Sequence, residues 1–170
     1  IKLLSTYQLE VVHVEEHYIH GGSLRLIIRK DKDSWYKFDY AKYVEKEISF
    51  DYNGWNDKVA YKIKKDRETI ENLDGTVAFF GAAAKGCVYM NALNLQASDK
   101  YLYIVDDTPA KEGKWMPGTG LQVVARDTLR YEKPDNLIIL AHNFKDYIIK
   151  SLDGYDGNII TMFWGDHADF

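Results

Sequence analysis

Two stretches near the start of the chain alternate apolar and polar positions, as half-buried β-strands do. Residues 7–14 alternate around Leu9 and Val11, and residues 23–29 follow the same pattern. Residues 18–22 lie between them and contain two adjacent glycines, which favour a turn. The pattern therefore predicts a β-hairpin. Because an isolated hairpin is only marginally stable in water, we expect it to pack on another part of a protein.

The periodicity becomes helical over residues 39–72, where apolar side chains recur three, four or seven positions apart. Asn53 and Gly54 form a turn signal, so we expect them to divide this segment into two helices. Residues 62–68 are nearly all charged. Such a run predicts the solvent-exposed face of the second helix.

From residue 76 onward, short apolar runs alternate with helical or loop segments. A continuous apolar run is what a parallel sheet requires when it is covered on both faces. The predicted strands are residues 77–80, 101–105, 121–124, 137–140 and 159–163, and the predicted helices are residues 86–95 and 143–152. This order predicts an α/β fold with a small, open and mostly parallel sheet. Right-handed crossovers would place its ligand site at the carboxyl ends of the strands.

Composition narrows the class of protein. The chain has 170 residues, of which 46% are hydrophobic and 28% charged, as in a soluble protein with one core. A net charge of −4 and a pI near 5.7 argue against a nucleic-acid or membrane-surface partner. Cys87 is the only cysteine, which excludes an internal disulfide and fits a cytoplasmic location. No apolar run approaches the length of a membrane span.

The junction after the first strand of the predicted sheet carries the strongest candidate chemistry. Gly81 permits a turn that a side chain would crowd, and the alanines of residues 82–84 leave backbone N–H groups accessible. Lys85 adds a positive charge where the helix dipole is also positive. The segment matches neither the dinucleotide-binding nor the Walker glycine pattern, so tight strand-to-helix packing is the alternative to phosphate binding. The candidate phosphate-binding residues are Gly81, Ala82, Ala83, Lys85 and Gly86.

Two further loops should open on the same edge of the sheet. Asp106 and Asp107 follow the second strand, where an acidic side chain can accept hydrogen bonds from sugar hydroxyls or simply form a turn before Pro109. His142 and Asn143 follow the fourth strand and could donate to a phosphate or a sugar. Asn143 is also a natural N-cap for the next helix, and the two roles are compatible.

The predicted hairpin turn holds a second polar cluster. His20, Ser23 and Arg25 could together bind a phosphate or a sugar, with an ordinary hairpin turn as the alternative. Residues 117–120, Pro-Gly-Thr-Gly, could let a ligand approach backbone amides or could simply connect two strands. The histidines of the first strand stand too far apart on an extended chain to share an ion easily, so no metal site is expected.

Four segments, in this order, resemble the carboxyl-terminal part of the bacterial sugar C-methyltransferases. They are residues 20–25 (HGGSLR), residues 80–86 (FGAAAKG), residues 105–119 with VDDTPAKEGK and PGT, and residues 134–145 with PDNLIIL and NFK. Enzymes of this family use S-adenosylmethionine to methylate a ring carbon of a nucleotide-linked keto-sugar. The resemblance implies that the turn at residues 81–86 lies beside the nucleotide-sugar site, and it adds Lys145 to the candidate residues.

The resemblance also implies a division of the chain. Residues 1–30 would form a β-hairpin that resembles the end of a methyltransferase domain, residues 31–75 a helical connector, and residues 76–170 a Rossmann-like α/β domain. In the family, a zinc-binding domain and a methyltransferase domain precede this region. Their cysteine cluster, glycine-rich cofactor turn and tyrosine-x-glutamate-histidine segment do not occur in this sequence. We therefore expect no cofactor, metal or catalytic residue in this chain.

These expectations describe the carboxyl-terminal, nucleotide-sugar-binding portion of a sugar C-methyltransferase-like protein, with S-adenosylmethionine implied only for the full-length family. Its partners would be a nucleoside diphosphate sugar and a missing or separate methyltransferase domain. A chain that starts at Ile1 fits a fragment or a split subunit. Two alternatives stay open: a stand-alone structural or interaction module that has lost methyl transfer, and a small sugar-phosphate enzyme that uses His20 or His142 as acid and base.

Overall fold

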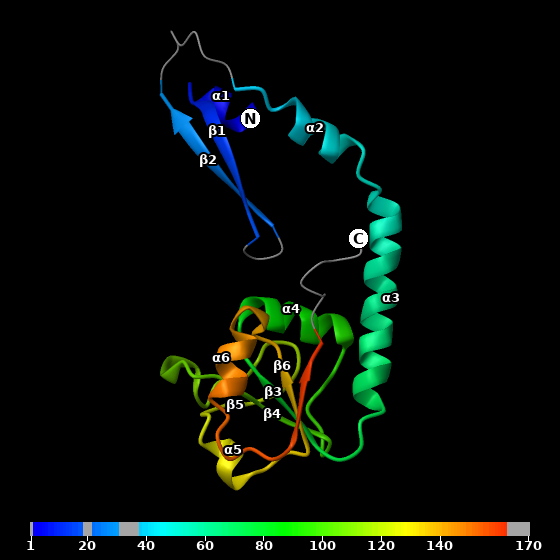
Figure 1. Cartoon of the computed structure of the whole chain (residues 1–170). Coiled ribbons are helices and arrows are strands. Elements are labelled where there is room, and N and C mark those ends of the chain that lie inside the picture. Colours follow the sequence, from blue (N-terminus) through cyan, green and yellow to red (C-terminus); the bar gives the residue numbers. More distant parts are fainter. Residues whose placement is uncertain (1, 19–21, 31–37, 163–170) are drawn as a thin grey trace. The chain divides into compact units, whose positions relative to one another are not determined.

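The computed structural model describes residues 2–18, 22–30 and 38–162 (Figure 1). The chain divides into two compact units, residues 1–52 and residues 53–170, and each unit is described by itself. His20 and part of the predicted hairpin turn lie outside the described residues.

The first unit contains the predicted β-hairpin. Strands β1 (Glu10–His17) and β2 (Ser23–Arg29) pair antiparallel, in a register that runs from Glu10 opposite Arg29 to His17 opposite Ser23. The register shifts between Val11 and His13, so the ladder contains an irregularity that the alternation did not predict. A short helix, α1 (Lys2–Thr6), precedes the hairpin and was also not predicted.

Two helices follow, but the expected break between them was placed wrongly. Helix α2 (Ala41–Ile48) ends where the Ser49 hydroxyl donates to the Glu45 carbonyl at 2.8 Å, and helix α3 (Tyr52–Glu71) begins soon afterwards. Asn53 and Gly54 therefore lie in the first turn of α3. The first four N–H groups of a helix have no partner within it, so a glycine there interrupts no hydrogen-bond ladder.

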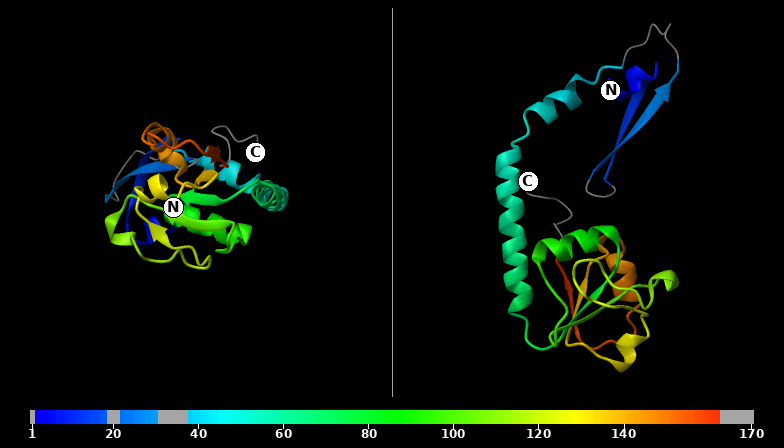
Figure 2. Two further views of the ribbon diagram at one scale, coloured as in Figure 1. Left: turned by 90° about the horizontal axis from the view of Figure 1, so that it is seen from below. Right: turned by 180° about the vertical axis from the view of Figure 1, so that it is seen from behind.

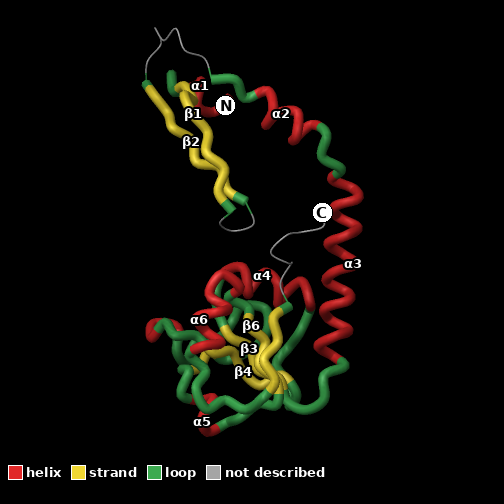
Figure 3. Tube along the Cα trace, in the orientation of Figure 1, coloured by secondary structure: helices red, strands yellow, loops and turns green. Residues whose placement is uncertain are grey.

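The second unit is a Rossmann-like α/β domain, as predicted. Its five strands are all parallel and lie in the order β5-β4-β3-β6-β7. Figure 3 labels the three central strands, β4, β3 and β6. They are β3 (Val77–Phe80), β4 (Tyr101–Val105), β5 (Val123–Val124), β6 (Asn136–Ile139) and β7 (Asn158–Thr161). The helices are α4 (Ala84–Leu93), α5 (Thr128–Tyr131) and α6 (Lys145–Lys150), with 3-10 turns η2 (Pro109–Lys111) and η3 (His142–Phe144).

The sheet is covered on both faces, which is why its strands read as continuous apolar runs. Val77 and Phe79 pack on one face with Ile70 of α3 and with α4, whereas Ala78 and Phe80 pack on the other face with residues of α5 and α6. All four residues of β3 are buried. The core residues of α3 and α4 therefore cover one face and those of α5 and α6 the other; Figure 2 gives two further views, with α4 in green and α6 in orange.

Strand β5 is shorter than the predicted residues 121–124 because its other edge belongs to a local hairpin. The amide of Val123 donates to the Lys114 carbonyl at 2.7 Å, and the amide of Met116 donates to the Leu121 carbonyl at 2.8 Å. The backbone of the preceding loop therefore covers the free edge of the sheet at this point, as edge protection requires.

Candidate functional site

The strand order creates a topological switch point at the carboxyl end of the sheet. The chain leaves β3 toward β4 and β5 on one side, and later places β6 and β7 on the other side of β3. In open α/β sheets, ligands bind outside the carboxyl ends of the strands at such a switch point. We call the loops that follow these strands the carboxyl-end rim, which comprises residues 81–86, 106–111, 125–126 and 141–145.

The turn at residues 81–86 is tightly packed at its two glycines. Gly81 has φ +110°, and a Cβ there would lie 2.7 Å from the Ala141 Cβ and 2.9 Å from the Ala141 amide nitrogen. A Cβ at Gly86 would lie 2.9 Å from the Gly81 carbonyl oxygen. The packing role that the sequence left open is therefore real, and it brings the loop after β3 against the loop after β6.

The residues between these glycines are accessible. Ala83 and Lys85 are exposed, and α4 starts at Ala84, earlier than the predicted residue 86. Ala83 is the N-cap, and its methyl side chain makes no capping hydrogen bond. An uncapped helix amino terminus presents backbone N–H groups and a positive dipole end. A phosphate group could accept hydrogen bonds there, with Lys85 supplying a full charge.

Asp106, at the end of β4, forms the turn that was one of its two predicted roles. Its Oδ1 accepts from the Thr108 amide at 3.0 Å and its Oδ2 accepts from the Lys111 ammonium at 3.0 Å. The side chain is 9% exposed. Burial opposes the charged form, but the hydrogen bonds from Thr108 and Lys111 outweigh it and hold the pKa of Asp106 below its ordinary value. A sugar hydroxyl would have to share a carboxylate whose oxygens are both engaged.

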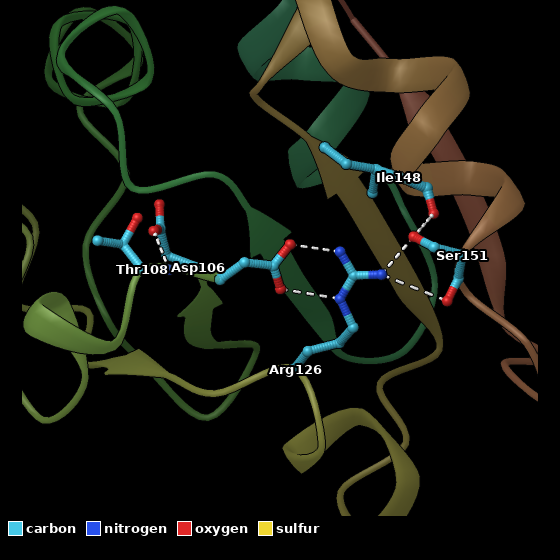
Figure 4. A network of polar contacts seen from close by, with 6 residues as sticks. Asp106, Thr108, Arg126, Ile148 and Ser151 are labelled. Carbon is cyan, nitrogen blue, oxygen red and sulfur yellow. Dashed lines mark hydrogen bonds and ion pairs between the residues drawn. The ribbon is translucent and has the colours of Figure 1, made fainter.

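Asp107 and Arg126 make an ion pair that sequence considerations missed (Figure 4). The Arg126 Nε donates to Asp107 Oδ1 at 2.8 Å and Nη2 donates to Oδ2, so the pair is bidentate. From the other side, Arg126 Nη1 donates to the Ser151 carbonyl at 3.3 Å and to the Ser151 hydroxyl. Only its position after the third parallel strand could have drawn attention to Arg126.

His142 and Asn143 lie in η3, and Lys145 begins α6. The expectation that Asn143 is the N-cap of this helix is wrong, because the N-cap is Phe144. A 3-10 turn tightens the backbone before α6 and moves the helix start by two residues. Ala141, which contacts Gly81, directly precedes η3, so the structure brings residues 81–86 and 141–145 together.

Ser23 and Arg25 lie on β2, in the unit of residues 1–52, and so belong to a different unit from the rim. The Arg25 guanidinium donates to Glu15 across the hairpin at 2.9 Å, and its side chain is mostly exposed. This cross-strand pair is the ordinary hairpin role that was the alternative for Arg25.

The glycine-rich turn at residues 117–120 proves to be a packed connection. Asn91 of α4 donates to the Pro117 carbonyl at 3.0 Å, and Gln96 donates to the Gly118 carbonyl at 2.8 Å. Thr119 is fully buried, and its hydroxyl bonds to the Met116 carbonyl and the Leu121 amide. The turn is held against α4 by its own backbone acceptors.

Over the part of the chain that the structure describes, no three His, Cys, Asp or Glu side chains gather as a metal site would require. No helix in that part is both long enough and apolar enough to cross a membrane.

Fold and rim together define an α/β domain of the Rossmann-like class with a candidate anion site at its switch point. A comparison with known protein families identifies the family within this class. The model of the C-methyltransferase C-terminal domain matches residues 18–162, and the chain therefore belongs to that family. A search of curated proteins found no match.

Proposed function

We propose that this chain is the nucleotide-sugar-binding portion of a sugar C-methyltransferase-like protein. It binds the diphosphate of a nucleoside diphosphate sugar at the carboxyl-end rim, and the S-adenosylmethionine site belongs to another part of the protein. The observation that carries the proposal is the uncapped start of α4 beside Lys85, at the switch point of the sheet.

Several features of the rim support this function. The small side chains of residues 82–84 let an anion approach the backbone, and the helix dipole favours negative charge there. His142 lies in η3 and Lys145 begins α6, directly after Ala141, which packs against Gly81, and both can add donors to the rim. The family membership is consistent with a substrate-binding role for this domain.

The test is isothermal titration calorimetry with uridine, thymidine, adenosine and guanosine diphosphates and their sugar conjugates. Lys85→Ala should weaken binding by about 1.5–3 kcal/mol, the usual size for a charge-assisted hydrogen bond, and should lower the salt dependence. Lys133→Ala is the matched control, because Lys133 pairs with Asp156 near the amino ends of β6 and β7. Equal effects of the two substitutions would contradict the proposal.

A thermal-shift panel with the same ligands and S-adenosylmethionine separates the alternatives. A bound ligand at one hundred times its dissociation constant adds about 2.7 kcal/mol to the free energy of unfolding. We expect a nucleotide sugar to raise Tm and S-adenosylmethionine to leave it unchanged. Stabilisation by S-adenosylmethionine would place its site in this chain, and stabilisation by no ligand would favour an interaction module.

A further inference from the structure

Arg126 follows β5 on the carboxyl-end rim, and its guanidinium lies over a ring on the face of the sheet that α5 and α6 cover. Its Cζ lies 5.0 Å from the centroid of the Phe80 ring, and Phe80 is the last residue of β3, directly before Gly81.

The two partners of this guanidinium differ in how firmly they are held (Figure 4). Ser151 follows α6, and its hydroxyl donates to the Ile148 carbonyl at 2.7 Å while accepting from Arg126. Asp107 comes from the loop after β4 and is 47% exposed, against 25% for the Arg126 side chain. Ser151 is thus a fixed anchor, and Asp107 is an exposed partner.

The neighbouring carboxylate provides a direct contrast. Asp106 is tied both to Lys111 and to the Thr108 amide, and its side chain is 9% exposed. Among the described residues, the Asp107 carboxylate has Arg126 as its hydrogen-bonding partner and no other. The Asp106–Lys111 pair therefore has a buried carboxylate, whereas the carboxylate of the Asp107–Arg126 pair is exposed to solvent.

We propose that Arg126 is an anion-binding residue of the rim, and that Asp107 occupies its guanidinium fork until a phosphate group of the ligand replaces it. This inference rests on the proposed function. A carboxylate and a phosphate both satisfy the fork of an arginine in a bidentate manner, and the phosphate carries more charge per pair of oxygens. An ion pair as exposed as this one contributes little to stability, so its exchange costs little.

The experiment compares charge-matched variants by calorimetry with uridine diphosphate and with inorganic pyrophosphate. Arg126→Gln should weaken binding of both ligands by about tenfold or more relative to Arg130→Gln. Only the substitution at Arg126 removes a charge-assisted hydrogen bond to the ligand. Asp107→Asn should strengthen binding by about threefold or more relative to Asp127→Asn, because the internal competitor is removed. Arg130 and Asp127 form an exposed pair of their own, which makes them suitable controls.

The opposite sign at Asp107 would overturn the inference. If Asp107→Asn weakens binding as Arg126→Gln does, the pair is a structural clamp. If Arg126→Gln lowers the affinity no more than Arg130→Gln does, while Lys85→Ala still weakens binding, the inference fails and the proposed function stands. If Arg126→Gln weakens ligand binding and Lys85→Ala does not, the inference stands, and residues 81–86 are not the phosphate-binding turn. Absence of binding to the wild-type chain overturns both. Thermal unfolding of each variant by circular dichroism confirms that it is folded.

Discussion

Gly81 and Gly113 show, at the scale of single residues, how the same backbone conformation can have different consequences. Both have positive φ, +110° and +74°. A Cβ at Gly81 would collide with Ala141, whereas a Cβ at Gly113 would meet nothing within 4 Å. At Gly113, only the backbone conformation therefore favours glycine. At Gly81, the missing side chain also allows two loops of the rim to pack together.

We expect Gly81→Ala to lower the free energy of unfolding by about 3 kcal/mol or more, because backbone strain and overpacking against Ala141 add. Gly113→Ala should cost only about 1–2 kcal/mol, the usual strain of a left-handed residue. Urea unfolding followed by circular dichroism measures both. Similar losses in the two variants would show that the contact with Ala141 relaxes freely.

At the scale of elements, helix α3 is anchored to the α/β domain by a carboxylate that was expected to face solvent. Asp66 is 5% exposed, and the Tyr89 hydroxyl of α4 donates to its Oδ2 at 2.6 Å. Lys62 donates to the same oxygen and to the Met162 carbonyl. The charged run of residues 62–68 is therefore not a uniformly solvated face. A buried carboxylate is tolerated because it is paired and hydrogen-bonded.

Removing the Tyr89 hydroxyl tests this anchor. We expect Tyr89→Phe to destabilise the domain by about 1.5–3 kcal/mol, the range for a hydrogen bond to a charged group. Tyr61→Phe is the control, since Tyr61 lies on α3 together with Asp66 and is 69% exposed. Urea unfolding that shows no difference between the two variants would mean that Lys62 alone satisfies Asp66.

Three partly or fully buried tyrosines predict a loss of stability in alkali. Burial, followed by the hydrogen bond to Asp66 and the charge of that carboxylate, raises the pKa of Tyr89. Burial also raises the pKa of Tyr103, and that of Tyr155 to about 12. The unfolded chain releases these protons near pH 10, before the folded protein does. The contribution of these tyrosines to folding stability is thus complete below about pH 10 and is lost as the pH rises toward 12.

The measurement is Tm at pH 9 and at pH 11 for the wild type, Tyr155→Phe and Tyr131→Phe. We expect a smaller fall in Tyr155→Phe than in the wild type, because one group with a raised pKa has been removed. Tyr131 is 82% exposed and serves as the control. A fall in Tyr155→Phe as large as that of the wild type would contradict this origin of the pH dependence.

At the scale of the whole molecule, burial is distributed unevenly between the two units. Within the described part of residues 1–52, Val11 is the one buried hydrophobic residue, while both core clusters belong to residues 53–170. Leu24, Leu26 and Ile28 of β2 are all more than 40% exposed. The second unit therefore has a hydrophobic core of its own, and the first has little.

Truncation locates the start of the independently folding part. We expect residues 53–170 to unfold cooperatively, and residues 76–170 to be less stable by about 2–5 kcal/mol or not to fold, because the second version loses the fully buried Ile70 and the Asp66 anchor. Urea unfolding of both versions tests this. Equal stability would place the start of the domain at residue 76.

Strands β3 and β4 could be predicted to the residue because a strand buried on both faces is marked by its own apolar run. The hairpin, the parallel sheet and the resemblance to the family likewise depend on patterns within short segments. The break between α2 and α3 was misplaced because a glycine in the first turn of a helix costs little, which a turn signal does not reveal.

The sequence by itself determined the α/β class, the order of the strands along the chain and the family. Only the tertiary structure decided which polar residues meet. Asp66 and Tyr89 are 23 residues apart, and Asp107 and Arg126 are 19 residues apart, so no local pattern relates them. Hydrophobic runs act locally through secondary structure, whereas the pairing of charges depends on which strands become neighbours in the sheet. For that reason the charge pattern predicts an exposed Asp66, and the pairing of Arg126 with Asp107 depends on β5 lying beside β4.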